Sequence, residues 1–150
     1  MGQGLSQALG VGGLGEGVSG LVKYAMTIQS YRELAVWQKG IVLVKRVYLA
    51  VRTFPKGEQY GLTSQFTRAA VSIPANIAEG YGRNTRKDYA HFVGIALGSL
   101  AEVDTYVVVS RELGYLDEGT HHDLAAQVAE LERMLKSLRK KLQDAPATSP

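Results

Sequence analysis

Cysteine is absent from this chain of 150 residues. Without it there can be no disulfide bond, no thiolate ligand for a metal and no cysteine nucleophile. The absence is compatible with a reducing compartment, and we expect a cytoplasmic protein.

Long apolar runs are also missing. Glycines interrupt every apolar stretch of residues 1–25, which therefore lack the continuous centre of a signal peptide. No run approaches the roughly 18 apolar residues of a membrane span, so we expect no membrane segment. Residues 1–30 are predicted to form a flexible, glycine-rich leader. Residues 144–150, with two prolines and no apolar anchor, are predicted to form a disordered tail.

The composition is that of an ordinary folded domain. Hydrophobic residues make up 45% of the chain and charged residues 21%, which argues against a disordered protein. The length fits one domain, which we place at residues 31–143. The formal net charge of +3 permits nucleic-acid binding without requiring it, so the positions of the charges matter more than their sum.

Residues 31–53 carry the apolar spacing of one helix face. The residues that recur at steps of three and four are Leu34, Trp37, Ile41, Val44, Tyr48 and Val51. Phe54-Pro55 and Gly57 end this predicted helix, because proline lacks the next backbone donor.

A second helix is predicted from Thr63, as its N-cap, to Gly80, as a left-handed terminator. Its apolar face comprises Phe66, Ala70, Ile73 and Ile77. Pro74 lies inside this helix, so we expect a kink at residues 70–73.

The third helix is predicted to begin at Thr85, where Asp88 has capping-box spacing, and to run to Leu113 before Gly114. Its apolar residues occupy more than one stripe, so it needs cover on two sides. One cover is the bundle and the other is a candidate subunit interface. Gly94 and Gly98, one turn apart, would let another helix approach closely, in ordinary packing or at that interface.

The fourth helix is predicted to begin at Thr120 with Asp123 and continues through an unbroken apolar face: Leu124, Val128, Leu131, Leu135, Leu138 and Leu142. Four helices with short connections predict an all-α, antiparallel, up-and-down four-helix bundle with a kinked second helix.

Signatures of catalysis are few. A carboxylate-bridged metal centre in a four-helix bundle needs two Glu-x-x-His motifs, and only Asp88-x-x-His91 comes near. His121 and His122 are neighbours and point in different directions. The Gly-x-Ser-x-Gly elbow and the phosphate-binding glycine loop with its lysine are missing. We therefore expect no enzyme, no metal and no cofactor.

Several ordered stretches carry a resemblance to a known family. They are Leu34, Val36, Trp37, Gln38 and Lys39; Phe54, Pro55, Glu58, Tyr60, Gly61 and Leu62; Gln65, Arg68, Ala69 and Ala70; the segment SIPANIAEGYGR; and Ala96, Gly98, Ser99, Glu102, Leu113, Gly114 and Tyr115. From Tyr31 to Leu142 the chain resembles the four-helix-bundle family encoded by intervening sequences in bacterial 23S rRNA genes. Relatives of that family include the accessory variability determinant protein of diversity-generating retroelements.

The resemblance implies a four-helix protomer that assembles as a ring-shaped homopentamer. In the retroelement relatives it implies binding to nucleic acid and to a reverse transcriptase. For most members the biochemical function is unassigned, so the resemblance gives fold more firmly than partner.

Basic residues form two predicted groups. Arg32, Lys39 and Arg46 stand seven apart, opposite the apolar face of the first helix, with Lys45 and Arg52 on an adjacent line; we call these five the basic ridge. The second group precedes the third helix and ends the fourth: Arg83, Arg86, Lys87, Arg133, Lys136, Arg139, Lys140 and Lys141. Contacts between these cations and phosphates would release counterions. Alternatively, they are the ordinary charged exterior of a bundle, with cations favoured near a helix C-terminus.

Polar residues interrupt the second and third helices. Arg68, Asn76, Glu79 and Glu102 are predicted to form a buried network that fixes helix register, with Asn76 bonding backbone groups freed by Pro74. The alternative is a small-molecule or catalytic pocket between helices.

Two functional hypotheses follow. The first is a homo-oligomeric scaffold that binds RNA, or an RNA-associated protein, through a basic surface. The second is a protein-interaction module in which the apolar face of the third helix recruits a partner. Phosphate binding weakens steeply with salt and apolar association does not, so salt dependence separates the two.

Overall fold

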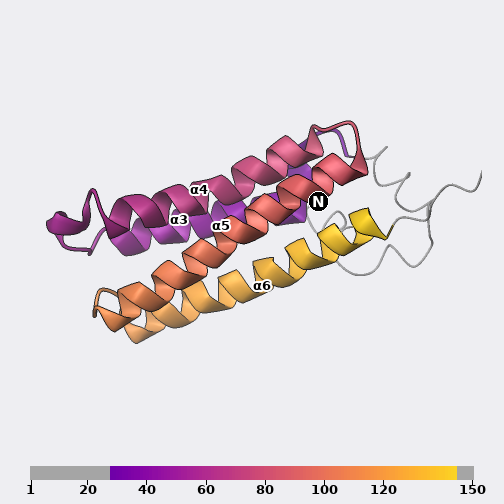
Figure 1. Ribbon diagram of the computed structural model, residues 1–150. Helices are drawn as coiled ribbons and strands as arrows, with labels where there is room; N and C mark the ends of the chain where they lie inside the picture. Colours follow the sequence, from indigo (N-terminus) through magenta and orange to yellow (C-terminus); the bar gives the residue numbers. More distant parts are fainter. Residues whose placement is uncertain (1–27, 145–150) are drawn as a thin grey trace, which may run out of the picture.

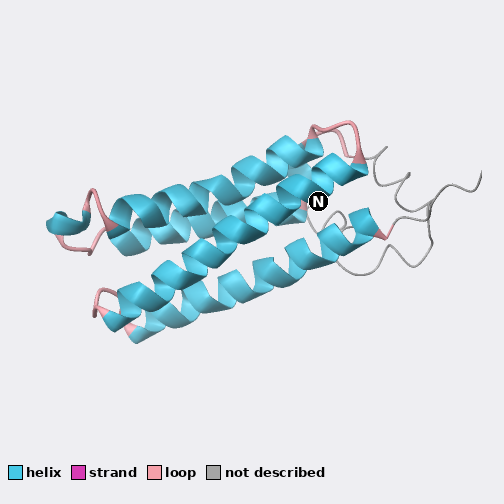
Figure 2. Ribbon diagram, viewed as in Figure 1, coloured by secondary structure: helices cyan, strands magenta, loops and turns pink. Residues whose placement is uncertain are grey.

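The computed structural model describes residues 28–144, and every element in that range is helical (Figures 1 and 2). Two 3₁₀ turns, Tyr31–Glu33 and Lys56–Glu58, accompany four long helices. These helices are α3 (Ala35–Val51), α4 (Leu62–Tyr81), α5 (Arg86–Glu112) and α6 (Glu118–Gln143). The predictions for residues 1–27 and 145–150 lie outside the described residues.

The helices form an antiparallel four-helix bundle, as predicted. Successive helices pack as α3 against α4, α4 against α5 and α5 against α6, and α3 closes the bundle against α6. The connections lie at the two ends of the bundle (Figure 2). The α4–α5 loop lies at one end, and the α3–α4 and α5–α6 loops lie at the other (Figure 1).

The buried seam of the first helical segment matches the prediction only in part: Leu34 is buried, and Trp37, Val44 and Val51 are half-buried against the core. The core takes Val36, Leu43, Val47 and Ala50, together with Gly40. Of the predicted face, Ile41 is 41% exposed and Tyr48 is 50% exposed. Helix α3 therefore carries two apolar stripes with the same spacing. The stripe that includes Val36, Leu43 and Val47 is buried in the core, and the predicted stripe lies beside it.

The first turn of α4 differs from the prediction. Thr63 lies inside the helix, whose N-cap is Gly61. A glycine has no side chain to cap with, and the Glu58 carboxylate instead accepts a hydrogen bond from the Leu62 N–H at 3.1 Å. The preceding 3₁₀ turn thus supplies the missing acceptor for a free helix donor.

Helix α4 continues through Pro74, which is buried. A Cβ built on Gly40 of α3 would lie 3.4 Å from the Pro74 Cβ, so the glycine lets α3 approach the proline ring closely. The proline does not end the helix, and a kink at residues 70–73 stays a prediction.

Gly80 does not terminate α4, which was predicted to end there. It is a buried helical residue, and the helix ends at Tyr81 with Gly82 as its C-cap. A Cβ at position 80 would lie 2.8 Å from the Phe92 Cβ and 3.0 Å from the Tyr89 Cδ1. Gly80 is required because α4 and α5 meet closely at this level.

Helix α5 begins and ends as predicted. The Thr85 hydroxyl accepts a hydrogen bond from the Asp88 N–H at 3.1 Å. At the other end Gly114 adopts a left-handed φ of 76°. The Tyr115 N–H donates to the Ser110 carbonyl at 2.8 Å and the Gly114 N–H to the Arg111 carbonyl at 2.9 Å, which is a Schellman motif.

Helix α6 begins earlier than predicted. Its N-cap is Asp117, whose carboxylate accepts a hydrogen bond from the Thr120 N–H at 2.7 Å. Thr120 therefore lies in the first turn as a donor, and its predicted role as the cap is wrong.

Among residues 28–144, α5 alone is long and apolar enough to cross a membrane by length and composition, with a mean hydropathy of 1.6 over an 18-residue window. The criterion averages hydropathy and does not require an unbroken apolar run, so the expectation of no membrane segment stays a prediction. The core helix of a bundle passes the same test, and α5 packs along both α4 and α6. The criterion is therefore weak evidence for a membrane span.

Candidate nucleic-acid interface

Four of the predicted nucleic-acid-binding cations are already engaged by carboxylates. Their ion pairs are Lys39 with Glu130 at 3.1 Å, Arg46 with Asp123 at 3.5 Å, Arg83 with Glu79 at 2.6 Å, and Lys136 with Glu132 at 2.5 Å. All four pairs are well exposed, so each adds little to stability. They do lower the positive potential around these four cations.

The basic ridge is consequently smaller than predicted. Lys39 and Arg46 bridge α3 to α6 through their carboxylate partners, rather than facing outward alone. Within the part of the chain that the structure describes, Arg32, Lys45 and Arg52 form no ion pair. Because these three are spread along the length of α3, they make no concentrated patch.

Six further predicted cations have no ion pair within residues 28–144: Arg86, Lys87, Arg133, Arg139, Lys140 and Lys141. Three of them, Arg86, Lys87 and Arg139, line one cavity between the beginning of α5 and the end of α6. Lys140 and Arg133 are exposed on α6. Three unpaired cations are therefore brought to the end of the bundle where α5 begins and α6 ends.

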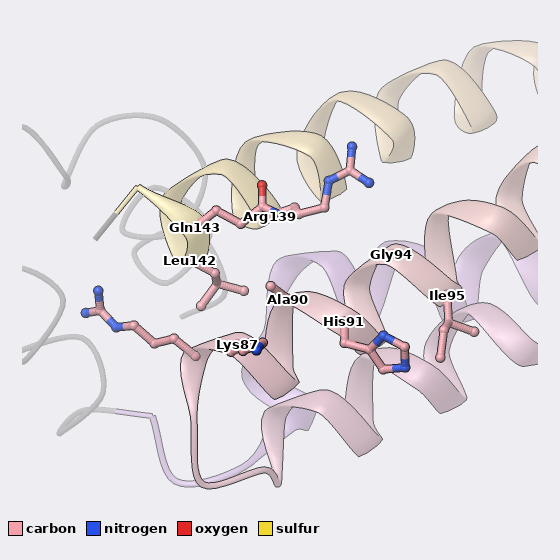
Figure 3. A pocket seen from close by; sticks show the side chains of 9 residues that line it. Lys87, Ala90, His91, Gly94, Ile95, Arg139, Leu142 and Gln143 are labelled. Atoms are coloured by element: carbon pink, nitrogen blue, oxygen red, sulfur yellow. The ribbon is translucent and has the colours of Figure 1, made fainter. Parts of the chain in front are cut away.

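That space, which we call the cationic cavity, has a volume of about 780 Å³. From α5 it is lined by Arg86, Lys87, Ala90, His91, Gly94 and Ile95, and from α6 by Arg139, Leu142 and Gln143 (Figure 3). No carboxylate is part of this lining. The cavity thus combines three permanent positive charges with an apolar floor.

Local structure fixes the backbone positions of these three residues. The Thr85 cap sets the start of α5, so Arg86 and Lys87 occupy its first turn. Arg139 stands four residues after buried Leu135 and three before Leu142, a spacing that keeps it half-buried beside α5. Three like charges around one cavity repel one another, and an anion placed among them would relieve that repulsion.

Two neighbouring basic side chains are modified by their surroundings. The Arg83 guanidinium lies over the Phe92 ring, 4.7 Å from its centroid, in a cation–π contact. Burial lowers the pKa of Lys141 on α6. Arg83 is therefore held by α5 as well as by Glu79, which leaves it less available to a ligand.

The predicted buried network of Arg68, Glu79 and Glu102 does not form. All three side chains are exposed. Glu79 pairs with Arg83, and Glu102 accepts a hydrogen bond from the Tyr106 hydroxyl at 3.5 Å. Each charge stays in water because burial would have cost desolvation energy. None of the three lines the cationic cavity.

A neutral cluster takes the place of that network. The Asn76 Nδ2 donates to the Ser72 carbonyl at 2.8 Å and to the Ser72 Oγ at 2.9 Å. The hydroxyls of Ser72 and Ser99 lie 2.8 Å apart and link α4 to α5. The prediction that Asn76 bonds backbone groups freed by Pro74 is wrong, because the carbonyl that Pro74 frees is that of Ala70, whereas Asn76 bonds the carbonyl of Ser72.

Two glycines of α5 have no close packing partner among residues 28–144. A Cβ built on Gly94 or on Gly98 would meet nothing within 4 Å. Ordinary tight packing, one of the two predictions for this pair, is therefore excluded within the described residues. The sequence contained a signal for this surface in the glycine spacing, although it could not show that the space beside it is open.

Exposed apolar side chains occur on both α3 and α5. On α3 the second stripe, Trp37, Ile41, Val44, Tyr48 and Val51, stays half-buried or exposed. On α5 the exposed members are Ile95, Val108 and Val109, with Leu113 at its end. The candidate subunit interface assigned to the third helix thus has a rival in the stripe of α3, which is the more continuous of the two.

Metal-ligating side chains do not gather in the described part of the chain. Among residues 28–144 no group of three histidine, aspartate or glutamate side chains could hold a metal ion.

Comparisons with known proteins give a family and a fold. The family model described as 23S rRNA-intervening sequence protein matches residues 32–137. A crystal structure of a protein of unknown function from the S23 ribosomal protein family of Bacteroides thetaiotaomicron is similar, with a TM-score of 0.65 and 22% identity over 70% of this chain and 95% of that one. No curated protein matches the chain.

Proposed function

We propose that this chain, which belongs to the 23S rRNA-intervening sequence protein family, is a non-catalytic homo-oligomeric scaffold that binds RNA through phosphate contacts. The observation that supports the proposal most strongly is the cationic cavity, which Arg86, Lys87 and Arg139 line without a carboxylate among the lining residues.

Phosphate binding follows from elementary electrostatics. Each lysine or arginine that neutralises a phosphate releases condensed counterions, so affinity falls with salt in proportion to the number of contacts. Arginine also presents a planar fork that matches a phosphate. Two arginines and one lysine around a single cavity offer about three such contacts per protomer. Repetition of the cavity in an oligomer would add avidity without any new contact.

The oligomer is the second part of the proposal. The stripe of α3 exposes 41% of Ile41 and 50% of Tyr48, and an apolar surface of this kind favours burial against another subunit. We propose self-association through this stripe into a ring, with a pentamer as the resemblance implies. The cationic cavities, between α5 and α6, would remain open to RNA.

Binding of a fluorescent structured RNA tests the phosphate-contact proposal. With three contacts per engaged protomer, affinity should fall roughly 20-fold between about 50 and 200 mM salt. The variant Arg86→Gln/Lys87→Gln/Arg139→Gln should weaken binding at least about tenfold at low salt and flatten the salt dependence.

A matched variant controls for net charge. Lys39→Gln/Arg46→Gln/Arg83→Gln removes the same number of positive charges, but from cations that carboxylates already neutralise. It should weaken binding less than about threefold. Equal losses in the two variants would contradict the proposed site, and wild-type protein that binds no RNA at low salt would contradict the function.

A protein-interaction module is the second candidate function. Val108, Val109 and Leu113 on α5 are exposed, which favours apolar recruitment of a partner, with a reverse transcriptase as the partner that the retroelement resemblance implies. Apolar association would survive about 200 mM salt, where the phosphate contacts weaken. Assembly and partner binding that persist there without RNA would favour this candidate.

A further inference from the structure

The cationic cavity continues along the bundle into a second hollow. That hollow has a volume of about 390 Å³ and lies between α5 and α6. Gly94 and Arg139 line both spaces, so the two adjoin. We call the second space the glycine groove, because Gly94 and Gly98 form its α5 side together with Leu97 and Ala101.

The glycines of this groove need an explanation. Glycine in the middle of a helix destabilises it relative to alanine. At Gly80 a close contact with α5 accounts for that cost, whereas at Gly94 and Gly98 nothing lies within 4 Å of a built Cβ. No contact among residues 28–144 therefore requires a glycine at either position, and a flat group could lie directly on the helix backbone there.

The charges of the two spaces differ. In the glycine groove Lys136 pairs with Glu132, and Asp104 adds a negative charge, so the groove is close to neutral. The lining of the cationic cavity is positive throughout its charged members. An occupant that spans both is favoured if it presents its negative charge to the cationic cavity and an uncharged, flat face to the glycine groove.

We propose that the cationic cavity and the glycine groove together bind single-stranded RNA, an inference that rests on the proposed function and specifies its ligand. Phosphates of the strand contact Arg86, Lys87 and Arg139, and unpaired bases lie against the bare backbone at Gly94 and Gly98. Bases of a duplex are stacked within the helix and cannot lie flat on a protein surface, whereas bases of a single strand can.

The two volumes are suited to a short stretch of strand. The cationic cavity of about 780 Å³ is open to solvent, so a chain can enter and leave it. Its floor of Ala90, Ile95 and Leu142 is apolar and accepts the face of any base. Binding in this cavity should therefore depend little on the RNA sequence. Other positively charged grooves that bind single-stranded nucleic acid are similarly tolerant of sequence.

The test compares an unstructured RNA of about 12 nucleotides with a duplex of equal charge, by fluorescence anisotropy at low salt. Wild-type protein should bind the single strand at least about fivefold more tightly than the duplex. Gly94→Leu fills the open space and should weaken single-strand binding at least about tenfold, with duplex binding changed less than about twofold.

Gly57→Leu is the matched control. A Cβ at Gly57 also meets nothing within 4 Å, and this glycine lies in the α3–α4 connection at the opposite end of the bundle. Its single-strand binding should equal that of the wild type. Gly94→Ala is a smaller change that should raise the melting temperature and weaken single-strand binding by a smaller factor than Gly94→Leu. A variant that is more stable but binds more weakly shows that the loss of binding does not come from a loss of folding.

Each remaining outcome overturns a distinct claim. If Gly94→Leu binds the single strand as the wild type does, the claim that bases lie in the glycine groove is overturned. The proposed function stands in that case, provided that the wild type binds RNA. Equal weakening of strand and duplex overturns the selectivity for single strands. Wild-type protein that binds neither RNA overturns the proposed function and this inference with it. A fall in the assembly mass of Gly94→Leu, without a change in RNA binding, shows that the groove takes a helix of another subunit instead.

Discussion

Asp117 is the N-cap of α6 and stabilises the start of that helix. Its carboxylate accepts the Thr120 N–H at 2.7 Å, and this hydrogen bond lowers the pKa of Asp117. Asp117→Ala leaves a free donor at the helix N-terminus and should lower the free energy of unfolding. Urea unfolding followed by circular dichroism measures the difference.

The same residue gives a pH dependence of known sign. Because the pKa of Asp117 is lower in the folded than in the unfolded protein, its carboxylate stabilises the fold above the unfolded pKa of about 3.9. That stabilisation is lost as pH falls through the folded value. Asp104→Ala, at an exposed position within α5, is the control and should not lower stability. Equal stability of Asp117→Ala and wild type at neutral pH would show that the cap contributes nothing.

Residues that cap helices were predictable only in part. Thr85 with Asp88 was correct: the Thr85 hydroxyl accepts a hydrogen bond from the Asp88 N–H, although Asn84 directly before it could also have capped the helix. Thr120 was wrong because Asp117, three residues earlier, offers a stronger acceptor for the same first turn. At α4 the acceptor is the side chain of Glu58 in the preceding 3₁₀ turn, and simple cap patterns do not search there.

Packing between elements explains why the glycines of α4 and α5 have opposite roles. Gly80→Ala places a Cβ 2.8 Å from the Phe92 Cβ and should lower the free energy of unfolding by about 1–3 kcal/mol, despite the better helix propensity of alanine. Gly98→Ala meets open space and should raise it by about 0.5–1 kcal/mol. Denaturant unfolding of both variants gives the comparison, and a stabilising Gly80→Ala would contradict the close contact between α4 and α5.

The choice between two apolar stripes on α3 could not be made from the sequence. Val36, Leu43 and Val47 repeat with the same period as Trp37, Val44 and Tyr48, so periodicity supports both faces equally. Contact with α4 at Gly40 and Pro74 selects the first stripe. Helix α5 posed a different difficulty, because its apolar residues surround more of the helix and mark no single face.

At the level of the whole molecule, the basic residues could be identified from the sequence, but their ion pairs and their positions relative to one another could not. The sequence supplied every basic residue of the candidate interface. The pairs of Lys39 with Glu130 and Arg46 with Asp123, however, depend on the register between α3 and α6, which lie at opposite ends of the described chain. The cationic cavity likewise requires the beginning of α5 to face the end of α6. Only the folded bundle shows that Arg86, Lys87 and Arg139 line one cavity, while Lys39 and Arg46 of the basic ridge are paired with carboxylates.

The exposed apolar stripe of α3 is the surface through which we propose that the whole molecule self-associates. Ile41 and Tyr48 are already exposed, so Ile41→Glu/Tyr48→Glu should preserve the helical fold and convert the assembly to monomers. Val108→Glu alters an equally exposed apolar side chain of α5 and should leave the assembly intact. Dissociation by Val108→Glu alone would move the interface from α3 to α5.

Light scattering on the purified protein, with and without a structured RNA and at low and moderate salt, is the most direct test of the scaffold. The predicted result is an assembly of several protomers whose mass rises with RNA at low salt and returns toward that of the protein alone at about 200 mM. A wild-type monomer, or an assembly whose mass is indifferent to RNA at both salts, would contradict the account.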